Sequence, residues 1–110
     1  DTFAYDAENN KTKREREVRA AEHLYGMLPE TQGEELRALW EEFEAQETPE
    51  SHFALAMDRI EPILLNAAGG GGTWKSNQIR KEDVYDRIEP ERKFPPLYAM
   101  IKEKVDAFFQ

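Results

Sequence analysis

The amino-acid sequence predicts an all-α protein with a single domain over residues 1–110. Its longer segments carry apolar residues at three- and four-residue spacing, which is the period of an amphipathic helix. No segment alternates apolar and polar residues in the manner of a β-strand. Residues such as Gly and Pro separate the helical segments, and 110 residues are enough for one small hydrophobic core.

The first half of the chain contains two predicted helices. Residues 1–10 are expected to be extended or looped, because Asn9 and Asn10 break regular structure. A helix over residues 11–28 follows and stops at Pro29, and a second helix covers residues 34–46. The apolar faces of the two helices are formed by Val18, Ala21, Leu24, Tyr25 and Leu28 and by Leu36, Leu39, Trp40 and Phe43, and the opposite face of the second is acidic (Glu41, Glu42, Glu44).

The third helix has a clear start signal. Thr48 is a hydroxyl N-cap, Pro49 fits the first helical position, and Glu50 places an acid in the positive first turn. This helix is expected to end near residue 66. Residues 67–73 contain four consecutive glycines and predict a flexible loop without the Lys-Ser/Thr ending of a phosphate-binding P-loop.

Two further helices are predicted after the glycines. A short helix covers residues 81–88, and a final helix follows Phe94-Pro95-Pro96 and runs to residue 109. Its apolar face is formed by Leu97, Ile101, Val105 and Phe108.

Composition excludes several classes of partner. The chain has 23 acidic and 15 basic residues and a net charge of −8, which argues against a nucleic-acid polymer. The basic run at residues 11–19 is interleaved with glutamates and predicts a solvated helix face rather than a phosphate-binding patch. A small phosphorylated substrate stays compatible with this acidity, because a divalent metal can supply positive charge.

The compartment is predicted from segments and residue types that the sequence lacks. There is no cysteine for a disulfide or a thiolate zinc site, no apolar run of about 20 residues and no signal sequence. We therefore expect a cytoplasmic protein with no membrane partner. The chain starts at Asp1 without a methionine or a helix start signal, which is typical of a piece of a longer protein.

Asp58 is the most unusual residue of the third helix. At about 100° per residue its neighbours on the helical wheel are Ala54, Leu55 and Leu65, so we expect its side chain to point into the protein. A buried carboxylate needs a cation, a hydrogen-bond network or a metal as its partner. The wheel alone favours a structural ion pair over a metal ligand. Glu61 also falls in the apolar sector, where it could support a metal ligand or pair with an arginine, and the structural pairing is favoured.

Other candidate residues are given structural roles. His23 and His52 have no second His or Cys at metal-ligand spacing and are expected at the surface or at a helix edge. Trp40 and Trp74 are expected in the core or in caps. No Ser-His-Asp order, nucleophile elbow or dinucleotide fingerprint is present. These residues alone do not identify an activity.

Three sequence stretches resemble a known family. They are DTFAYD at residues 1–6, LPE at residues 28–30 and LRALWEEFEAQETPESHFALAMDRIEPILLN at residues 36–66. They resemble the branch of the HD-domain superfamily of metal-dependent phosphohydrolases that includes the 5′-deoxynucleotidases and HD domain-containing protein two. The resemblance is close over residues 1–66 and loose after the glycines. It implies an HD-domain-like helical bundle, of which this chain is the C-terminal portion.

The resemblance assigns roles to particular residues. The superfamily is named for a metal-binding set formed by a His, an adjacent His-Asp pair and a distant Asp on a later helix. Asp58, in the stretch AMDRIEP, matches the distant Asp, which implies that it is a catalytic metal ligand. Asp1 matches a catalytic, nucleotide-contacting Asp, and Thr2, Phe3 and Ala4 match residues that line the substrate.

The first His and the His-Asp pair of the superfamily are absent from this sequence. His23 and His52 follow the DTF segment and therefore do not replace them. The resemblance thus implies activity for the full protein and an inactive 110-residue chain.

The function implied by the resemblance is the hydrolysis of nucleoside 5′-monophosphates, in particular deoxynucleoside ones, to nucleoside and phosphate. It requires one divalent metal ion (cobalt or manganese, or else magnesium, zinc, nickel or iron), which polarises the phosphate and activates a bound water. Relatives imply a homodimer. Two alternatives stay open: a non-catalytic helical interaction module, and an HD hydrolase that acts on another nucleotide.

Overall fold

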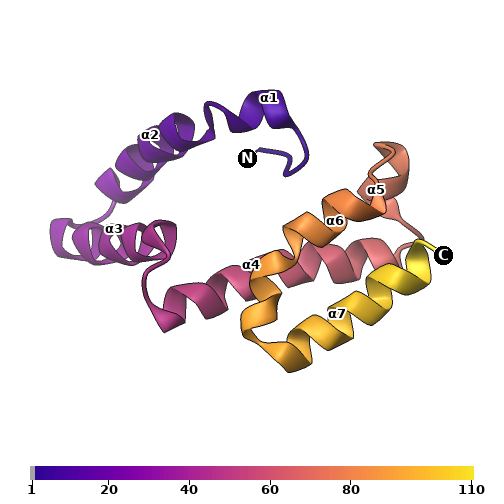
Figure 1. Cartoon of the computed structure of the whole chain (residues 1–110). Helices are drawn as coiled ribbons and strands as arrows, with labels where there is room; N and C mark the ends of the chain where they lie inside the picture. Colours follow the sequence, from indigo (N-terminus) through magenta and orange to yellow (C-terminus); the bar gives the residue numbers. More distant parts are fainter. Residues whose placement is uncertain (1) are drawn as a thin grey trace. The chain divides into compact units, whose positions relative to one another are not determined.

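The computed structural model describes residues 2–110, and these residues form helices and no β-strand. The prediction of an all-α fold is therefore confirmed. The elements in chain order are α1 (Ala7–Asn10), α2 (Lys13–Gly26), α3 (Glu30–Ala45), α4 (Pro49–Ala68), α5 (Gly72–Ser76), α6 (Lys81–Arg87), the 3-10 helix η1 (Glu89–Lys93) and α7 (Pro95–Phe108) (Figure 1). None of the helices among these residues is long and apolar enough to cross a membrane.

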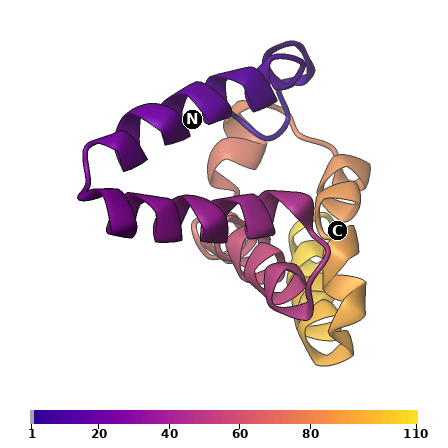
Figure 2. The ribbon, with the colours of Figure 1, turned by 90° about the vertical axis from the view of Figure 1, so that its left-hand side faces the viewer.

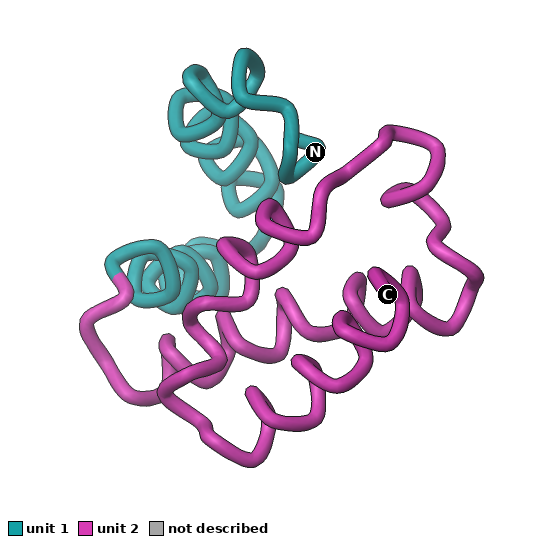
Figure 3. Tube along the Cα trace, turned by 45° about the vertical axis from the view of Figure 1, so that its right-hand side comes forward, with its two compact units in different colours: residues 1–45 teal, residues 46–110 magenta. Residues whose placement is uncertain are grey.

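The chain forms two compact units, Asp1–Ala45 and Gln46–Gln110 (Figure 3). The first unit contains α1 to α3, and the second contains α4 to α7 with η1. The boundary lies directly before the Thr48-Pro49 helix start. That residues 1–110 make up a single domain stays a prediction.

Residues 7–10 form a helical turn, so the prediction of an extended or looped segment is wrong there. The Asp6 carboxylate caps α1 by accepting hydrogen bonds from the Asn9 backbone N–H (3.1 Å) and from the Asn9 side-chain amide (2.6 Å). The Asn10 amide donates to the backbone carbonyls of Phe3, Ala4 and Asp6 at 3.3, 3.2 and 2.7 Å. The two asparagines therefore stabilise the turn that they were expected to break.

Helices α2 and α3 run in opposite directions and are joined by a short turn (Figure 2). Ala21 of α2 and Gly33 of α3 are the buried residues of this pair. A Cβ atom on Gly33 would lie 2.5 Å from the carbonyl oxygen of Tyr25, so only glycine permits this close backbone approach. Several residues of the predicted apolar faces are nevertheless exposed, namely Leu24, Leu36 and Leu39.

The basic run of α2 lies against the acidic face of α3. Arg14 pairs with Glu44 at 3.3 Å and with Glu41 at 3.8 Å, and its guanidinium stacks over the Trp40 ring at 5.1 Å. These side chains are partly exposed, so each ion pair contributes little stability. The two ion pairs of Arg14 do show that part of the positive charge of the basic run at residues 11–19 is neutralised by glutamates of α3, as expected for a solvated helix face.

In the second unit, α6 runs back along α4, η1 turns the chain, and α7 runs in the direction of α4 (Figure 1). The predicted start of α4 is confirmed: the Thr48 hydroxyl accepts from the Ser51 backbone N–H at 3.1 Å, and the Ser51 hydroxyl accepts from the Thr48 backbone N–H at 3.2 Å. The core contains Ala56, Ile60 and Ile63 of α4, Val84 and Ile88 around α6, Ile101 and Val105 of α7, and Trp74 of α5.

The glycine segment is shorter and more structured than the loop predicted over residues 67–73. Helix α4 continues to Ala68 and α5 begins at Gly72. Gly70 and Gly71 have φ values of 72° and 110°, which reverse the chain in a left-handed conformation that suits glycine. The Asn66 side chain holds the turn, because its Oδ1 accepts from the Thr73 backbone N–H at 2.8 Å. The predictions for the helices at residues 81–88 and 97–109 are confirmed to within a residue or two.

Candidate functional site on helix α4

Asp58 is exposed, so the prediction that its side chain points into the protein is wrong for the described residues. The buried side of α4 is formed by Ala56, Ile60 and Ile63, and the helical period places Asp58 on the opposite side. The helical wheel gave the wrong burial for Asp58 because α4 has apolar residues on more than one side. Phe53, an apolar residue of the same helix, is 50% exposed.

The surface around Asp58 is apolar. The helical period brings Ala54 and Leu65 next to it, and both are exposed, Leu65 by 66%. Within the described part of the chain, Asp58 has no ion pair and no side-chain hydrogen bond. Asp58 thus lies between two exposed apolar side chains.

Glu61 is also exposed, and no ion pair of its carboxylate lies among residues 2–110. The expected pairing of Glu61 with an arginine in an apolar sector is therefore wrong. Ile60 and Ile63 point into the core from one side of α4, and the helical period directs Glu61 to a different side, toward solvent.

Pro62 changes the backbone directly below Asp58. Proline has no N–H group, so residue 62 cannot donate the usual helical hydrogen bond to the Asp58 carbonyl oxygen. Asp58 thus presents a backbone acceptor without its ordinary helical donor as well as an exposed carboxylate.

Arg59 fixes α4 against α6. Its Nη1 atom donates a hydrogen bond to the backbone carbonyl of Arg87 at 3.1 Å. Because Arg59 follows Asp58 directly, this contact restrains the rotation of the helix at the point where the acid is presented.

The residues of the substrate-lining prediction belong to the first unit. Asp1 lies outside the described residues. Thr2 and Ala4 are half-buried, and the exposed Phe3 ring makes an edge-to-face contact with Tyr5 at a centroid distance of 5.5 Å. The backbone of Phe3 and Ala4 is held by Asn10, so this turn presents side chains from a fixed backbone.

Among residues 2–110 there is no group of three or more His, Cys, Asp or Glu side chains that could hold a metal ion. His52 Nε2 lies 2.8 Å from the Gln46 carbonyl oxygen, so this nitrogen donates its proton to the backbone. His23 is exposed. Asp58 fits a metal as one oxygen ligand, but the described residues do not complete a metal site.

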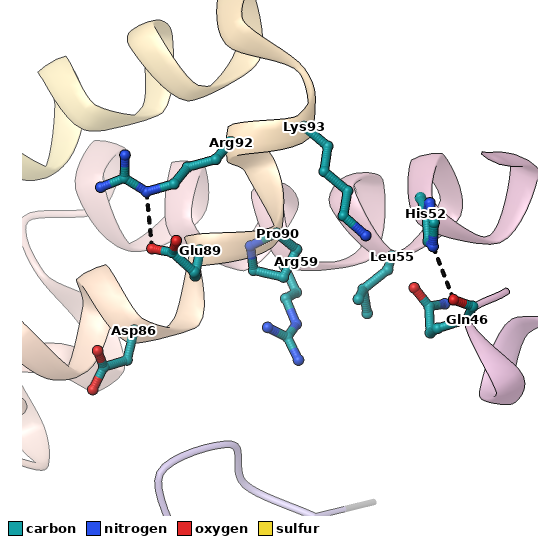
Figure 4. Close-up of a pocket in the computed structure, with 9 residues that line it drawn as sticks. All are labelled: Gln46, His52, Leu55, Arg59, Asp86, Glu89, Pro90, Arg92 and Lys93. Atoms are coloured by element: carbon teal, nitrogen blue, oxygen red, sulfur yellow. Dashed lines mark hydrogen bonds and ion pairs between the residues drawn. The ribbon is translucent and has the colours of Figure 1, made fainter. Parts of the chain in front are cut away.

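A pocket of about 520 Å³ lies in the second unit and is lined by Arg59, the residue that follows Asp58 in the chain (Figure 4). The sequence gives no sign of this pocket, because its side chains come from separate segments that only the fold brings together. Its lining residues are Gln46, His52, Leu55, Arg59, Asp86, Glu89, Pro90, Arg92 and Lys93.

Glu91 is a buried carboxylate that the sequence did not reveal. It lies in η1, is 0% exposed, and neither of its carboxylate oxygens has a hydrogen-bond donor within the described residues. Burial raises the pKa of Glu91 above its ordinary value, and the nearby charges of Arg59 and Arg87 lower the pKa by less.

Replacement of Glu91 by glutamine is expected to make the protein more stable at neutral pH. A raised pKa in the folded state means that folding favours protonated Glu91, so the free energy of unfolding falls as the pH rises from about 4.5 through the folded-state pKa. Glutamine keeps the shape without the charge, and the free energy of unfolding at about pH 7 should rise by about 1 kcal/mol or more. Urea unfolding between about pH 4 and pH 8 measures this, and the two proteins should converge near pH 4.

The matched control is Glu89→Gln in the same 3-10 helix. Glu89 is exposed and pairs with Arg92 at 2.9 Å, so its substitution should change stability by no more than about 0.5 kcal/mol. A Glu91→Gln variant that is less stable than the wild type at neutral pH would contradict the account of Glu91.

A family model described as HD domain matches residues 1–97 of this chain. This match covers most of the sequence and includes the DTFAYD turn, Asp58 and the pocket lined by Arg59. The chain therefore belongs to the HD domain family.

Individual relatives agree with this family. The chain is 32% identical over 91 residues to a bovine protein named 5′-deoxynucleotidase HDDC2 and 42% identical over 89 residues to the Xenopus laevis protein of that name. These matches cover 83% and 81% of this chain but only 43% of each relative. The chain thus spans less than half of the length of these relatives.

A solved structure has the same fold. It is the crystal structure of a predicted metal-dependent phosphohydrolase from Magnetospirillum magnetotacticum MS-1, with a TM-score of 0.80 and 41% sequence identity. The likeness covers 98% of this chain and 55% of that protein. The two chains therefore share the helical arrangement over almost all of the present sequence.

Proposed function

We propose that this protein, in its longest natural form, is a metal-dependent phosphohydrolase that converts nucleoside 5′-monophosphates, especially deoxynucleoside ones, to nucleoside and phosphate. The observation that carries the proposal is Asp58: an exposed carboxylate on an apolar face of α4, without an ion pair among the described residues, in a chain of the HD domain family. Relatives named 5′-deoxynucleotidase, at 31–42% identity, support the substrate class.

Asp58 has the properties of one ligand to a divalent cation. A carboxylate oxygen suits hard or borderline metals. The hydrogen bond from Arg59 to the Arg87 carbonyl restrains the rotation of α4, and this keeps Asp58 directed away from the core of the second unit. When bound, such a cation polarises a phosphate oxygen and lowers the pKa of a water molecule. Cobalt and manganese are the first metals to test, followed by magnesium, zinc, nickel and iron.

Residues 1–4 are the proposed nucleotide contact. Asp1 and Thr2 offer polar groups, and Phe3 offers an exposed ring that can lie against a base or sugar. The hydrogen bonds from Asn10 to the Phe3 and Ala4 carbonyls keep this backbone in one conformation, which reduces the entropy lost on binding.

The remaining ligands implied by the resemblance, a His and a His-Asp pair, are not in residues 1–110. We therefore propose that the 110-residue chain alone is inactive. A homodimer in the cytoplasm is part of the same proposal, and sedimentation analysis of the longest natural form measures its oligomeric state.

The experiment uses the longest natural form, stripped of metal and resupplied with each cation in turn. Phosphate release is measured from a panel of ribo- and deoxyribonucleoside 5′-monophosphates, with nucleoside triphosphates and cyclic nucleotides as further substrates. Metal-dependent release from the monophosphates is the expected result. Release only from another nucleotide would replace the substrate class, and a protein that binds no metal would favour the helical interaction module.

A further inference from the structure

The pocket between α4 and η1 gathers positive charge in a chain whose net charge is −8. His52 and Arg59 come from α4, and Arg92 and Lys93 come from η1. Leu55 and Pro90 form an apolar part of the same lining. A volume of about 520 Å³ with a few polar groups on an apolar wall is typical of a small-molecule site.

The charges in this pocket are separated by sign. Lys93, His52 and Arg59 surround Leu55, whereas Asp86 lies toward the other end of the pocket (Figure 4). Glu89 is neutralised by Arg92, whose Nε atom lies 2.9 Å from the Glu89 carboxylate. The Lys93 ammonium at the end near Leu55 is therefore not paired with either acid of the lining, Asp86 or Glu89.

Lys93 is the cation most available to a ligand. Within residues 2–110 no carboxylate lies within ion-pair distance of its ammonium group, which is also true of Lys75 and Lys104, but among these three lysines only Lys93 lines this pocket. The ammonium is directed along the pocket toward Leu55 and His52 (Figure 4). The His52 ring is held in place by its hydrogen bond to the Gln46 carbonyl.

We propose that this pocket binds the phosphate group of a small anionic ligand, with Lys93 as the main contact and with Arg59 and His52 beside it. Leu55 and Pro90 supply apolar surface for an organic group attached to that phosphate. The ligand class is free phosphate or a phosphate monoester. The site is separate from the proposed metal ligand and does not rest on the proposed hydrolysis.

The test is isothermal titration calorimetry on the longest natural form without metal, so that neither turnover nor a bound cation contributes. The probes are orthophosphate, 2′-deoxyadenosine 5′-monophosphate and 2′-deoxyadenosine. For the phosphate-bearing probes we expect a Kd on the order of 1 mM, and the Kd should rise about tenfold in the Lys93→Gln variant, which loses a charge-assisted hydrogen bond.

The matched control is Lys104→Gln in the same unit. Lys104 is an exposed lysine of α7 that lines a different pocket, formed with Leu64 and Phe108, and its substitution should leave the Kd unchanged. Equal affinity for orthophosphate and the monophosphate would identify free phosphate as the ligand, and tighter monophosphate binding would identify an ester. Both results support the site.

Two outcomes would overturn the anion site. One is phosphate binding that Lys93→Gln and Lys104→Gln weaken to the same extent or not at all. The other is 2′-deoxyadenosine binding as tightly as its monophosphate. Either result would leave the proposed phosphohydrolase activity standing, because that activity is measured with metal and by phosphate release.

Discussion

Asp58→Asn is expected to lower metal-dependent phosphate release by about 100-fold or more, with little change in the stability of the fold. The substitution replaces an anionic oxygen ligand with a neutral amide, so it weakens the binding of a divalent cation. Loss of a residue that only hydrogen-bonds to a metal ligand already lowers metal affinity or activity by about 10- to 100-fold, and loss of a ligand should cost at least as much. A 100-fold loss corresponds to about 2.7 kcal/mol of transition-state stabilisation. Phosphate release and the metal content of the purified protein are the measurements.

Because Asp58 is exposed, the effect of its substitution on activity can be separated from an effect on stability. Because the carboxylate is exposed and has no ion pair among the described residues, its substitution should change the free energy of unfolding by no more than about 0.5 kcal/mol. Glu61→Gln is the matched control, since Glu61 is exposed less than one turn away on the same helix. Equal losses in both variants, or full activity in Asp58→Asn, would remove Asp58 from the proposed site.

The helices could be predicted well because their signals are local. Thr48, Pro49 and the first-turn acid define the start of α4 within a few residues of sequence, and the capping hydrogen bonds confirm it. The DTFAYD turn shows the opposite case. Asn9 and Asn10 usually break structure, but Asp6 is an N-cap residue whose carboxylate caps this helical turn, and the effect of the asparagines outweighed that signal in the prediction.

Burial could not be predicted as well as helicity. A helical wheel gives the relative directions of side chains, but it does not say which apolar side faces the core. For α4 the apolar neighbours Ala54, Leu55 and Leu65 placed Asp58 inside, but the side of the helix that packs in the core is formed by Ala56, Ile60 and Ile63. Glu91 has the same explanation, because a charged run such as EPERK gives no sign that one of its acids is fully buried.

The residues that line the basic pocket are also far apart in the sequence. Asp58 and Arg59 are neighbours in the chain, but Lys93 reaches their helix only because α6 and η1 return along α4. Resemblance to the HD-domain superfamily directs attention to Asp58 and to residues 1–4, but not to the pocket, whose lining residues form no motif. The combination of an exposed acid, a proline that removes a helical donor and a basic pocket is visible only in the folded chain.

Trp74→Ala is expected to lower the free energy of unfolding by about 3–5 kcal/mol, the usual cost of removing a large aromatic side chain from a core. Trp74 is 1% exposed, and its ring centroid lies 5.3 Å from that of Phe108 and 5.4 Å from that of Phe109. These contacts pack α5 against the end of α7. Urea unfolding measures the change, and Trp40 remains as the fluorescent probe in the first unit.

Two further variants separate packing from hydrogen bonding at this position. The Trp74 indole N–H is buried without a hydrogen-bond partner among the described residues, so Trp74→Phe removes an unsatisfied donor while it keeps an aromatic ring. Trp74→Phe should therefore cost clearly less than Trp74→Ala. Trp40→Ala should also cost less, because Trp40 is only half-buried and its contact with Arg14 lies near the surface. A loss of less than about 1 kcal/mol in Trp74→Ala would mean that α5 does not contribute to the core of the second unit.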